Sequence, residues 1–279
     1  MNGSKVSTKG WAIHHLPNRL SNDTTQPTLS SRHQGSLADR IDALELVDLL
    51  ALASFESSRD DHAPISSTLR FTFELAGRLR QAQVLQLLED APRGLVWGQA
   101  RAIYDPITWA YLADPLERGV MRHHLAMRIQ QRVADGATEG ALWLWQRLAD
   151  AEFESYGAHL LRRHQMEPTW ARALFDRTES ELEELCLAQR RAVLWLGLKE
   201  GAATFLRTKG DAKQCLDAIV CEIRRQARWL RRHQPLASEW VPSTAWRQPL
   251  LLRSFLAAIP LGHRYWTEVP SVAAIEASR

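Results

Sequence analysis

The chain has 279 residues, of which 45% are hydrophobic and 24% are charged. A chain of this size and composition can bury a substantial core, which argues against disorder throughout. Its longest apolar run, residues 192–198, is far shorter than the roughly 18 residues that a membrane-spanning helix needs. The N-terminus also lacks the apolar stretch of a secretory signal. The sequence therefore predicts neither a membrane partner nor secretion.

The formal net charge of +3 is concentrated at one end of the chain. Residues 1–36 contain four basic residues and one acidic residue, so the charges of the remainder balance. A neutral body attracts polyanions only through local patches. The three cysteines, Cys186, Cys215 and Cys221, form no CxxC pair and lie in apolar helical patterns. This arrangement favours free thiols in a reducing compartment and predicts a cytoplasmic location.

The chain divides by composition into an arm and two helical lobes. Residues 1–36 are rich in Ser, Thr, Asn, Gln, His and Pro, without an apolar period, which predicts a disordered basic arm. From residue 37 onward, apolar residues recur at helical spacing. We therefore expect an all-α fold, a bundle or array of about eight or nine helices, with an N-terminal lobe at 37–105 and a C-terminal lobe at 106–279.

Local signals set the expected helix boundaries. Asp114 before Pro115 is a typical helix start, and Thr178 with Glu181 forms a capping-box pattern. The residues 95–104 are compatible with a short strand as well as with a helix. The predicted helices are 37–55, 69–91, 115–135, 138–164, 167–175, 179–198, 211–233 and 250–258.

Most signatures of catalysis, cofactor binding and metal binding are missing from the sequence. There is no phosphate-binding GxxxxGK[ST] loop, no GxGxxG, no HExxH and no GxSxG. Adjacent His123 and His124 point about 100° apart on a helix, so they do not share a metal easily. His159 and His164 are five residues apart, whereas helical ligand pairs are spaced by three or four. We expect no cofactor, no metal and no enzymatic activity.

One pattern nevertheless leaves an enzyme open. Arg118 and His123 form an R-x4-H motif within a predicted helix. This motif resembles the signature of the HEPN ribonucleases, in which Arg and His act on an RNA phosphate. Gly119 departs from that family, which usually has a polar side chain at this position. The resemblance implies, as one alternative, a ribonuclease that uses Arg118 and His123.

The helix expected at 211–233 segregates its charges. At 100° per residue, five arginines share an arc of about 120°, and the aliphatic side chains occupy another face. Trp229 flanks the basic arc. Guanidinium groups beside an aromatic ring suit contact with nucleic-acid phosphates, although pairing with acids of neighbouring helices is an equal alternative. The predicted nucleic-acid-binding residues are Arg224, Arg225, Arg228, Arg231, Arg232 and Trp229.

A short stretch also resembles a known regulator. The residues 166–174 (MEPTWARAL) are followed by Thr178, Leu182, Leu185 and Cys186. This pattern is similar to the helical module in the D component of the flagellar master transcriptional regulator and in related regulators of integrative conjugative elements. It covers residues 164–195, and the usual Arg-Leu-Gly lead-in is replaced by Arg162-Arg163-His164. The resemblance implies a DNA-binding transcriptional regulator that works with partner subunits.

Taken with the basic helix, these features predict a non-enzymatic regulatory subunit that binds DNA directly or through a partner. Partner protein subunits or a second copy of the chain are expected in its complex. Another alternative is a helical scaffold or adaptor that does not contact nucleic acid. Its interface anchors would be the C-terminal tryptophans, Trp240, Trp246 and Trp266.

Overall fold

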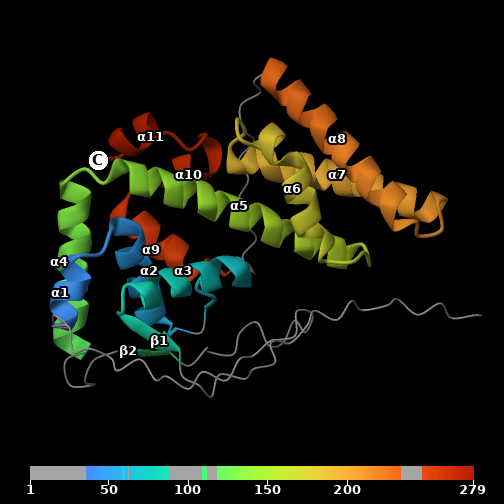
Figure 1. The fold of residues 1–279 in the computed structure, drawn as a ribbon. Coiled ribbons are helices and arrows are strands. Elements are labelled where there is room, and N and C mark those ends of the chain that lie inside the picture. Colours follow the sequence, from blue (N-terminus) through green and yellow to red (C-terminus); the bar gives the residue numbers. More distant parts are fainter. Residues whose placement is uncertain (1–35, 59, 62, 88–108, 112–117, 234–246) are drawn as a thin grey trace, which may run out of the picture. The chain divides into compact units, whose positions relative to one another are not determined.

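The computed structural model describes residues 36–58, 60, 61, 63–87, 109–111, 118–233 and 247–279 (Figure 1). The all-α prediction is confirmed, and the helices in these ranges are α1 (Leu37–Asp42), α2 (Leu46–Ser57), α3 (Leu69–Gln81), α4 (Arg118–Ala134), α5 (Thr138–Arg163), α6 (Trp170–Leu182), α7 (Leu187–Arg207), α8 (Ala212–His233), α9 (Leu250–Ala258), α10 (Arg264–Thr267) and α11 (Val272–Glu276). A short antiparallel pair joins β1 (Leu85–Leu87) to β2 (Trp109–Tyr111). Within the described ranges, none of the helices is long and apolar enough to cross a membrane.

Several sequence expectations fall outside the described residues. They include the predicted arm at 1–36, of which only Ser36 is described, and the uncertain segment 95–104. Ser36 caps α1, where its hydroxyl accepts from the Asp39 amide at 3.2 Å. The predicted lobe boundary at residues 105 and 106 is also outside the described part.

Three predicted helix boundaries are wrong. The helix expected over 69–91 ends at Gln81, and Leu85–Leu87 form the strand β1 instead. The helix expected over 37–55 is interrupted between α1 and α2. The capping box at Thr178 does not form, because Thr178 lies inside α6 and its hydroxyl donates to the Leu174 carbonyl at 2.7 Å. α7 instead begins after Cys186, whose backbone amide donates to the Gln189 side chain at 3.1 Å. Leu182 and Leu185 are both buried in the core, and their burial fixes the turn between α6 and α7.

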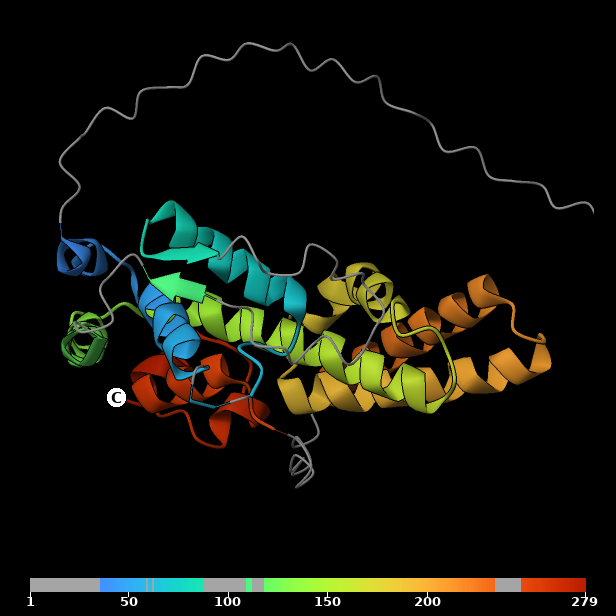
Figure 2. The ribbon, with the colours of Figure 1, turned by 90° about the horizontal axis from the view of Figure 1, so that it is seen from below.

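Two hydrophobic cores organise the described helices (Figures 1 and 2). The first core is built by α1 to α4, the first half of α5 and α9 to α11, so it draws on residues from both sides of the predicted boundary at 105 and 106. The second core is built by the rest of α5 with α6, α7 and α8. The helix α5 contributes to both, with Ala151 in the first and Phe153 in the second.

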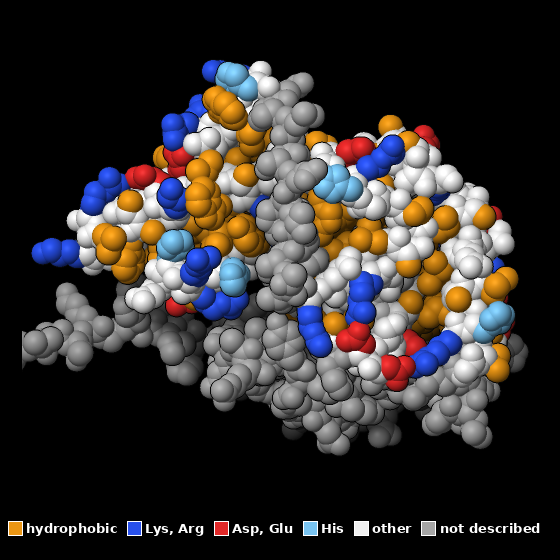
Figure 3. Space-filling model, turned by 180° about the vertical axis from the view of Figure 1, so that it is seen from behind, with side chains coloured by type: hydrophobic (Ala, Val, Ile, Leu, Met, Phe, Trp, Pro, Cys, Tyr) orange, Lys and Arg blue, Asp and Glu red, His pale blue; other side chains and the backbone are white. Residues whose placement is uncertain are grey.

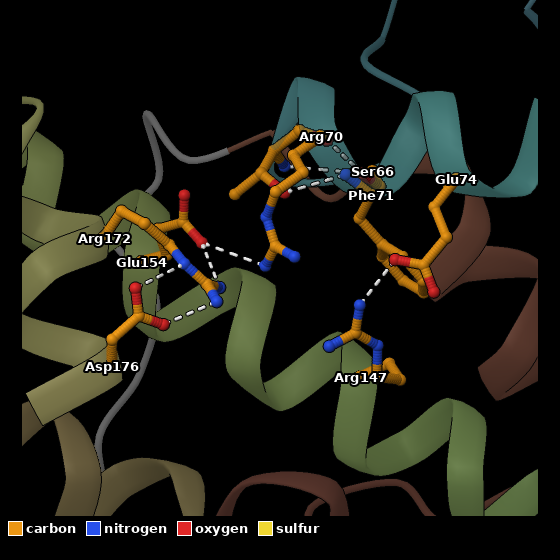
Figure 4. A network of polar contacts seen from close by, with 9 residues as sticks. Ser66, Arg70, Phe71, Glu74, Arg147, Glu154, Arg172 and Asp176 are labelled. Atoms are coloured by element: carbon orange, nitrogen blue, oxygen red, sulfur yellow. Dashed lines mark hydrogen bonds and ion pairs between the residues drawn. The ribbon is translucent and has the colours of Figure 1, made fainter. Parts of the chain in front are cut away.

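Ion pairs also connect α3, α5 and α6, which belong to different cores (Figure 4). Arg70 of α3 and Arg172 of α6 both point toward Glu154 of α5, at 3.4 and 3.6 Å between nitrogen and oxygen. Nearby, Arg147 of α5 pairs with Glu74 of α3 at 2.5 Å. Elements of the two cores are thereby joined by charges as well as by α5 itself.

A buried ion pair lies where the two cores meet. Glu152 of α5 and Arg191 of α7 are 1% and 4% exposed at their side chains, and their charged atoms are 2.7 Å apart. The Ser67 hydroxyl also donates to Glu152, and the Arg191 guanidinium lies 4.6 Å from the Tyr156 ring centre. Burial raises the pKa of Glu152 and lowers the pKa of the Arg191 guanidinium. The pair therefore carries a desolvation cost, which the contact between its members offsets.

Removing one member of this pair should destabilise the protein strongly. We expect Glu152→Ala to lower the free energy of unfolding by about 3 to 5 kcal/mol, because the Arg191 guanidinium stays buried without this carboxylate. The double variant Glu152→Leu with Arg191→Met should be closer to wild type than either single variant. Urea denaturation measures all of these values. The control is Glu200→Ala at the exposed Glu200–Arg207 pair, where the change should stay below about 1 kcal/mol.

Candidate nucleic-acid interface

The orientation of α8 is set by two glycines of α7. A Cβ added to Gly197 would lie 2.7 Å from Cγ1 of Ile223, and one added to Gly201 would lie 2.6 Å from Cδ1 of Ile219. Both distances are shorter than side-chain carbons tolerate, so only glycine allows α8 to come this close. The pairs 197 with 223 and 201 with 219 also show that the two helices run antiparallel. α7 and α8 thus form a tight hairpin, which Figure 2 shows side by side.

The helical periodicity of α8 correctly predicted which face it buries. Ile219, Ile223 and Ala227 are fully buried in the second core. The opposite face carries most of the predicted arginines, and Arg224, Arg225, Arg228 and Arg232 are exposed. Close packing of the aliphatic face therefore turns the basic face outward.

Two of the five predicted arginines dock α8 on its neighbours. Arg224 pairs with Glu181 of α6 at 2.8 Å and donates to the Arg177 carbonyl at 2.8 Å. Arg231 pairs with Glu184, in the turn after α6, at 3.4 Å. The sequence had left open whether the arginines are free or paired, and for these two the structure shows pairing. Their first role is to hold α8 against α6.

The other three arginines make no ion pair with another element among the described residues. Arg225 pairs within α8, with Glu222 at 2.6 Å, and this hydrogen bond holds the pKa of the Glu222 carboxyl below its usual value. Arg228 donates to the Arg224 carbonyl of its own helix at 3.2 Å. Arg232 forms neither a hydrogen bond nor an ion pair with the described residues. Arg228 and Arg232 thus contact no acid among the described residues, whereas Arg225 is held by Glu222 of its own helix.

Trp229 flanks the basic face as its sequence position predicted. Its side chain is 49% exposed, and its ring stacks on His233 with 4.8 Å between centres and 21° between planes. The whole helix holds six Lys or Arg residues and two acidic residues, and both acids are engaged by arginines. Figure 3 shows the molecule from behind, so the side that carries α6, α7 and α8 in Figure 1 lies at the left. Blue basic side chains are more prominent there than red acidic ones.

Sequence reasoning missed an aromatic residue on the neighbouring helix. Trp195 of α7 is 44% exposed, and the Lys199 ammonium lies 4.9 Å from its ring centre. The spacing could have revealed it, because the exposed positions of α7 before its last residue recur every three or four positions, at Ala192, Trp195, Lys199, Ala203 and Leu206. Gly197 and Gly201 face α8, so Trp195 and Lys199 lie on the side of α7 that points away from α8.

Most residues that the scaffold and ribonuclease alternatives depend on are buried or lie outside the described part of the chain. Trp266, expected as an exposed interface anchor, is only 9% exposed and belongs to the first core. Trp240 and Trp246 lie outside the described residues. His123 is exposed on α4, but the side chain of Arg118 is outside the described part, so the R-x4-H motif stays a prediction.

Comparison of the chain with protein-family models, with curated proteins and with solved structures finds no match in any of the three.

The close packing of α7 on α8 makes Gly201 sensitive to a single added methyl group. We expect Gly201→Ala to lower the free energy of unfolding by about 1 to 3 kcal/mol, because the new Cβ overlaps the Ile219 side chain. The matched control is Gly77→Ala in α3, where no atom lies within 4 Å of the added Cβ, so stability should rise slightly. Thermal unfolding measures both; equal effects would contradict the account.

The three thiols of the chain should differ in reactivity. Cys221 is exposed on α8, one or two turns from Arg224, Arg225 and Arg228, while Cys186 and Cys215 are buried. We expect a thiol reagent to modify Cys221 quickly in the folded protein and the other two only after denaturation. Mass spectrometry of the labelled peptides checks this. Rapid labelling of Cys215 would show that α8 does not pack as described.

Proposed function

We propose that this chain is a non-enzymatic subunit that binds DNA through the outer face of α8. The observation that carries the proposal is the set of three outward arginines, Arg225, Arg228 and Arg232, beside the exposed ring of Trp229. DNA phosphates attract such a face through release of condensed counterions, which does not require a specific sequence. The two acids of α8 reduce this attraction, because Glu222 is bound by Arg225 and Asp217 by Arg177.

The regulatory part of the proposal has a separate support. It comes from the resemblance of residues 164–195 to transcriptional regulators that work with partner subunits. In this protein the second helix of that stretch begins at Leu187, and Thr178 lies within α6, so the helix boundaries differ from the expected ones. DNA binding is therefore proposed from α8, and regulation with a partner is proposed only from the resemblance.

A scaffold or adaptor role is the second candidate, because large apolar side chains are exposed on several of the described helices. Leu206 of α7 is 81% exposed and Val120 of α4 is 76% exposed. Exposed apolar side chains in clusters mark protein contacts, although single ones are common on any surface. A protein that binds no DNA at any salt concentration but assembles with a second protein would favour this role over the first.

The salt dependence of DNA binding tests the proposed interface. Each phosphate contact that is lost should reduce the slope of log K against log salt by about 0.9. For Arg228→Ala with Arg232→Ala, we therefore expect weaker binding at low salt and a slope that is shallower by about 2. Fluorescence anisotropy of a labelled DNA duplex across a salt series gives both quantities.

The matched control is Arg80→Ala on α3, which removes an exposed arginine that makes no ion pair with the described residues and lies away from α8. Its affinity and slope should equal those of wild type. If the double variant also kept the wild-type affinity and slope, α8 would not be the site of DNA binding.

A further inference from the structure

The side of α7 that points away from α8 carries a stripe of mostly apolar residues. Lys199 lies at its centre and points about 160° away from Gly197 and Gly201, which face α8. One turn before it Trp195 is 44% exposed, and two turns after it Leu206 is 81% exposed. This outer face of α7 consists of Ala192, Trp195, Leu196, Lys199, Ala202, Ala203 and Leu206. Steps of three and four residues alternate along it, which is typical of a seam where two helices pack together.

The order of large and small side chains on this face reverses about Lys199. An antiparallel copy of the same helix, related by a two-fold axis at Lys199, sets each position beside the one that is equally far on the other side. Every level of the seam then joins a large side chain to a small one, as close packing requires. The pairs are Trp195 with Ala203, Leu196 with Ala202, and Leu206 with Ala192.

A parallel copy would not pack in this way, because each position would meet its own equivalent. Trp195 would then face Trp195, and Ala203 would face Ala203, which leaves a clash at one level and a gap at another. A helix of a different protein would need no reversal about a central residue. The symmetry of this face therefore argues for a second copy of the chain as its partner.

The single charged residue of the face lies on the two-fold axis. Lys199 would meet its own copy there, but its ammonium is already drawn to the Trp195 ring, 4.9 Å from the ring centre. Trp195 is one turn nearer the N-terminus of α7, and the N-terminal directions of two antiparallel helices are opposite. The two ammonium groups therefore point away from each other. A single lysine in an apolar seam lowers stability, but it also fixes the register of the two helices.

From this arrangement we infer that two copies of the chain associate through the outer face of α7, antiparallel and with Lys199 at the two-fold axis. The inference goes beyond the proposed function, because self-association requires no DNA. The basic face of α8 stays accessible in the dimer, since α8 lies on the opposite side of α7. One helix from each copy covers less than the about 800 Å² per partner of a standard stable interface, so we expect a reversible dimer with a micromolar Kd.

Cysteine cross-linking of the full chain tests the register. Cys221→Ser is the background, because it removes the exposed native thiol. In this background Lys199→Cys should form a disulfide-linked dimer under mild oxidation, since the two sulfurs meet at the axis. Ala192→Cys alone and Leu206→Cys alone should not, because each would lie about 21 Å from its own copy along the helices. An equimolar mixture of these two variants should cross-link.

Sedimentation equilibrium measures the strength of the association. We expect Trp195→Ala to weaken the dimer by about tenfold or more, and Ala203→Glu to do the same, because it buries a charge against Trp195 of the other copy. Lys199→Leu should tighten the dimer, because it removes the cation from the seam. The matched control is Ala126→Glu, which adds the same charge at an exposed position of α4 and should behave like wild type.

The outcomes also separate this inference from the proposed function. A wild-type chain that stays monomeric up to about 200 μM, with no cross-linking of Lys199→Cys, overturns the inference. Self-cross-linking of Leu206→Cys as readily as of Lys199→Cys contradicts the antiparallel register and overturns it too. In either case, salt-dependent binding of a duplex by α8 would still support the proposed function. Circular dichroism of each variant establishes that the helices are intact.

Discussion

The distance between α7 and α8 is the constraint on which the outer surface of this protein depends. Gly197 and Gly201 leave room for Ile223 and Ile219, so the aliphatic face of α8 packs directly against the α7 backbone. A helix with one face fixed in a core has its opposite face in solvent. Because the basic residues of α8 occupy that opposite face, two absent side chains on α7 determine where the arginines point.

The arginines on this face of α8 have two different roles. Arg224 and Arg231 hold α8 to α6 and to the turn after it, through Glu181 and Glu184. Arg225, Arg228 and Arg232 keep their charge on the solvent side. Because Arg224 and Arg231 are paired, fewer arginines can contact a phosphate. The same two ion pairs fix the position of α8 and therefore of its other arginines. A rigidly placed basic face loses less conformational entropy on binding than a mobile one.

The sequence predicted those parts of the fold whose signals are local. The periodicity of α8 identified its buried face, and the helix expected at 250–258 is α9. The expected helix boundaries were wrong where contacts between residues far apart in the sequence determine the structure. Thr178 looks like a helix start, but burial of Leu182 and Leu185 in the second core carries α6 past it. The short helices α10 and α11 lie in a segment whose pattern is too brief to show a period.

The polar contacts of the candidate site follow the same rule. The partners of Arg224 and Arg231 belong to other elements, 43 and 47 positions away in the sequence, so no spacing within α8 reveals them. For the same reason, Arg190 and Arg191 look like exposed bases of a helix, whereas they are buried against Asp150 and Glu152 of α5. A side chain's own helix predicts the direction in which it points, and its partners are known only from the fold.

The most direct measurement of the central claim, that the outer face of α8 is the DNA-binding surface, uses the thiol that this face already carries. Cys221 lies on it, three and four residues before Arg224 and Arg225. The rate at which a maleimide modifies Cys221 in the wild-type chain should fall when saturating DNA is added and recover at high salt, because counterion release drives the contact. DNA that binds to the protein without changing this rate would contradict the account.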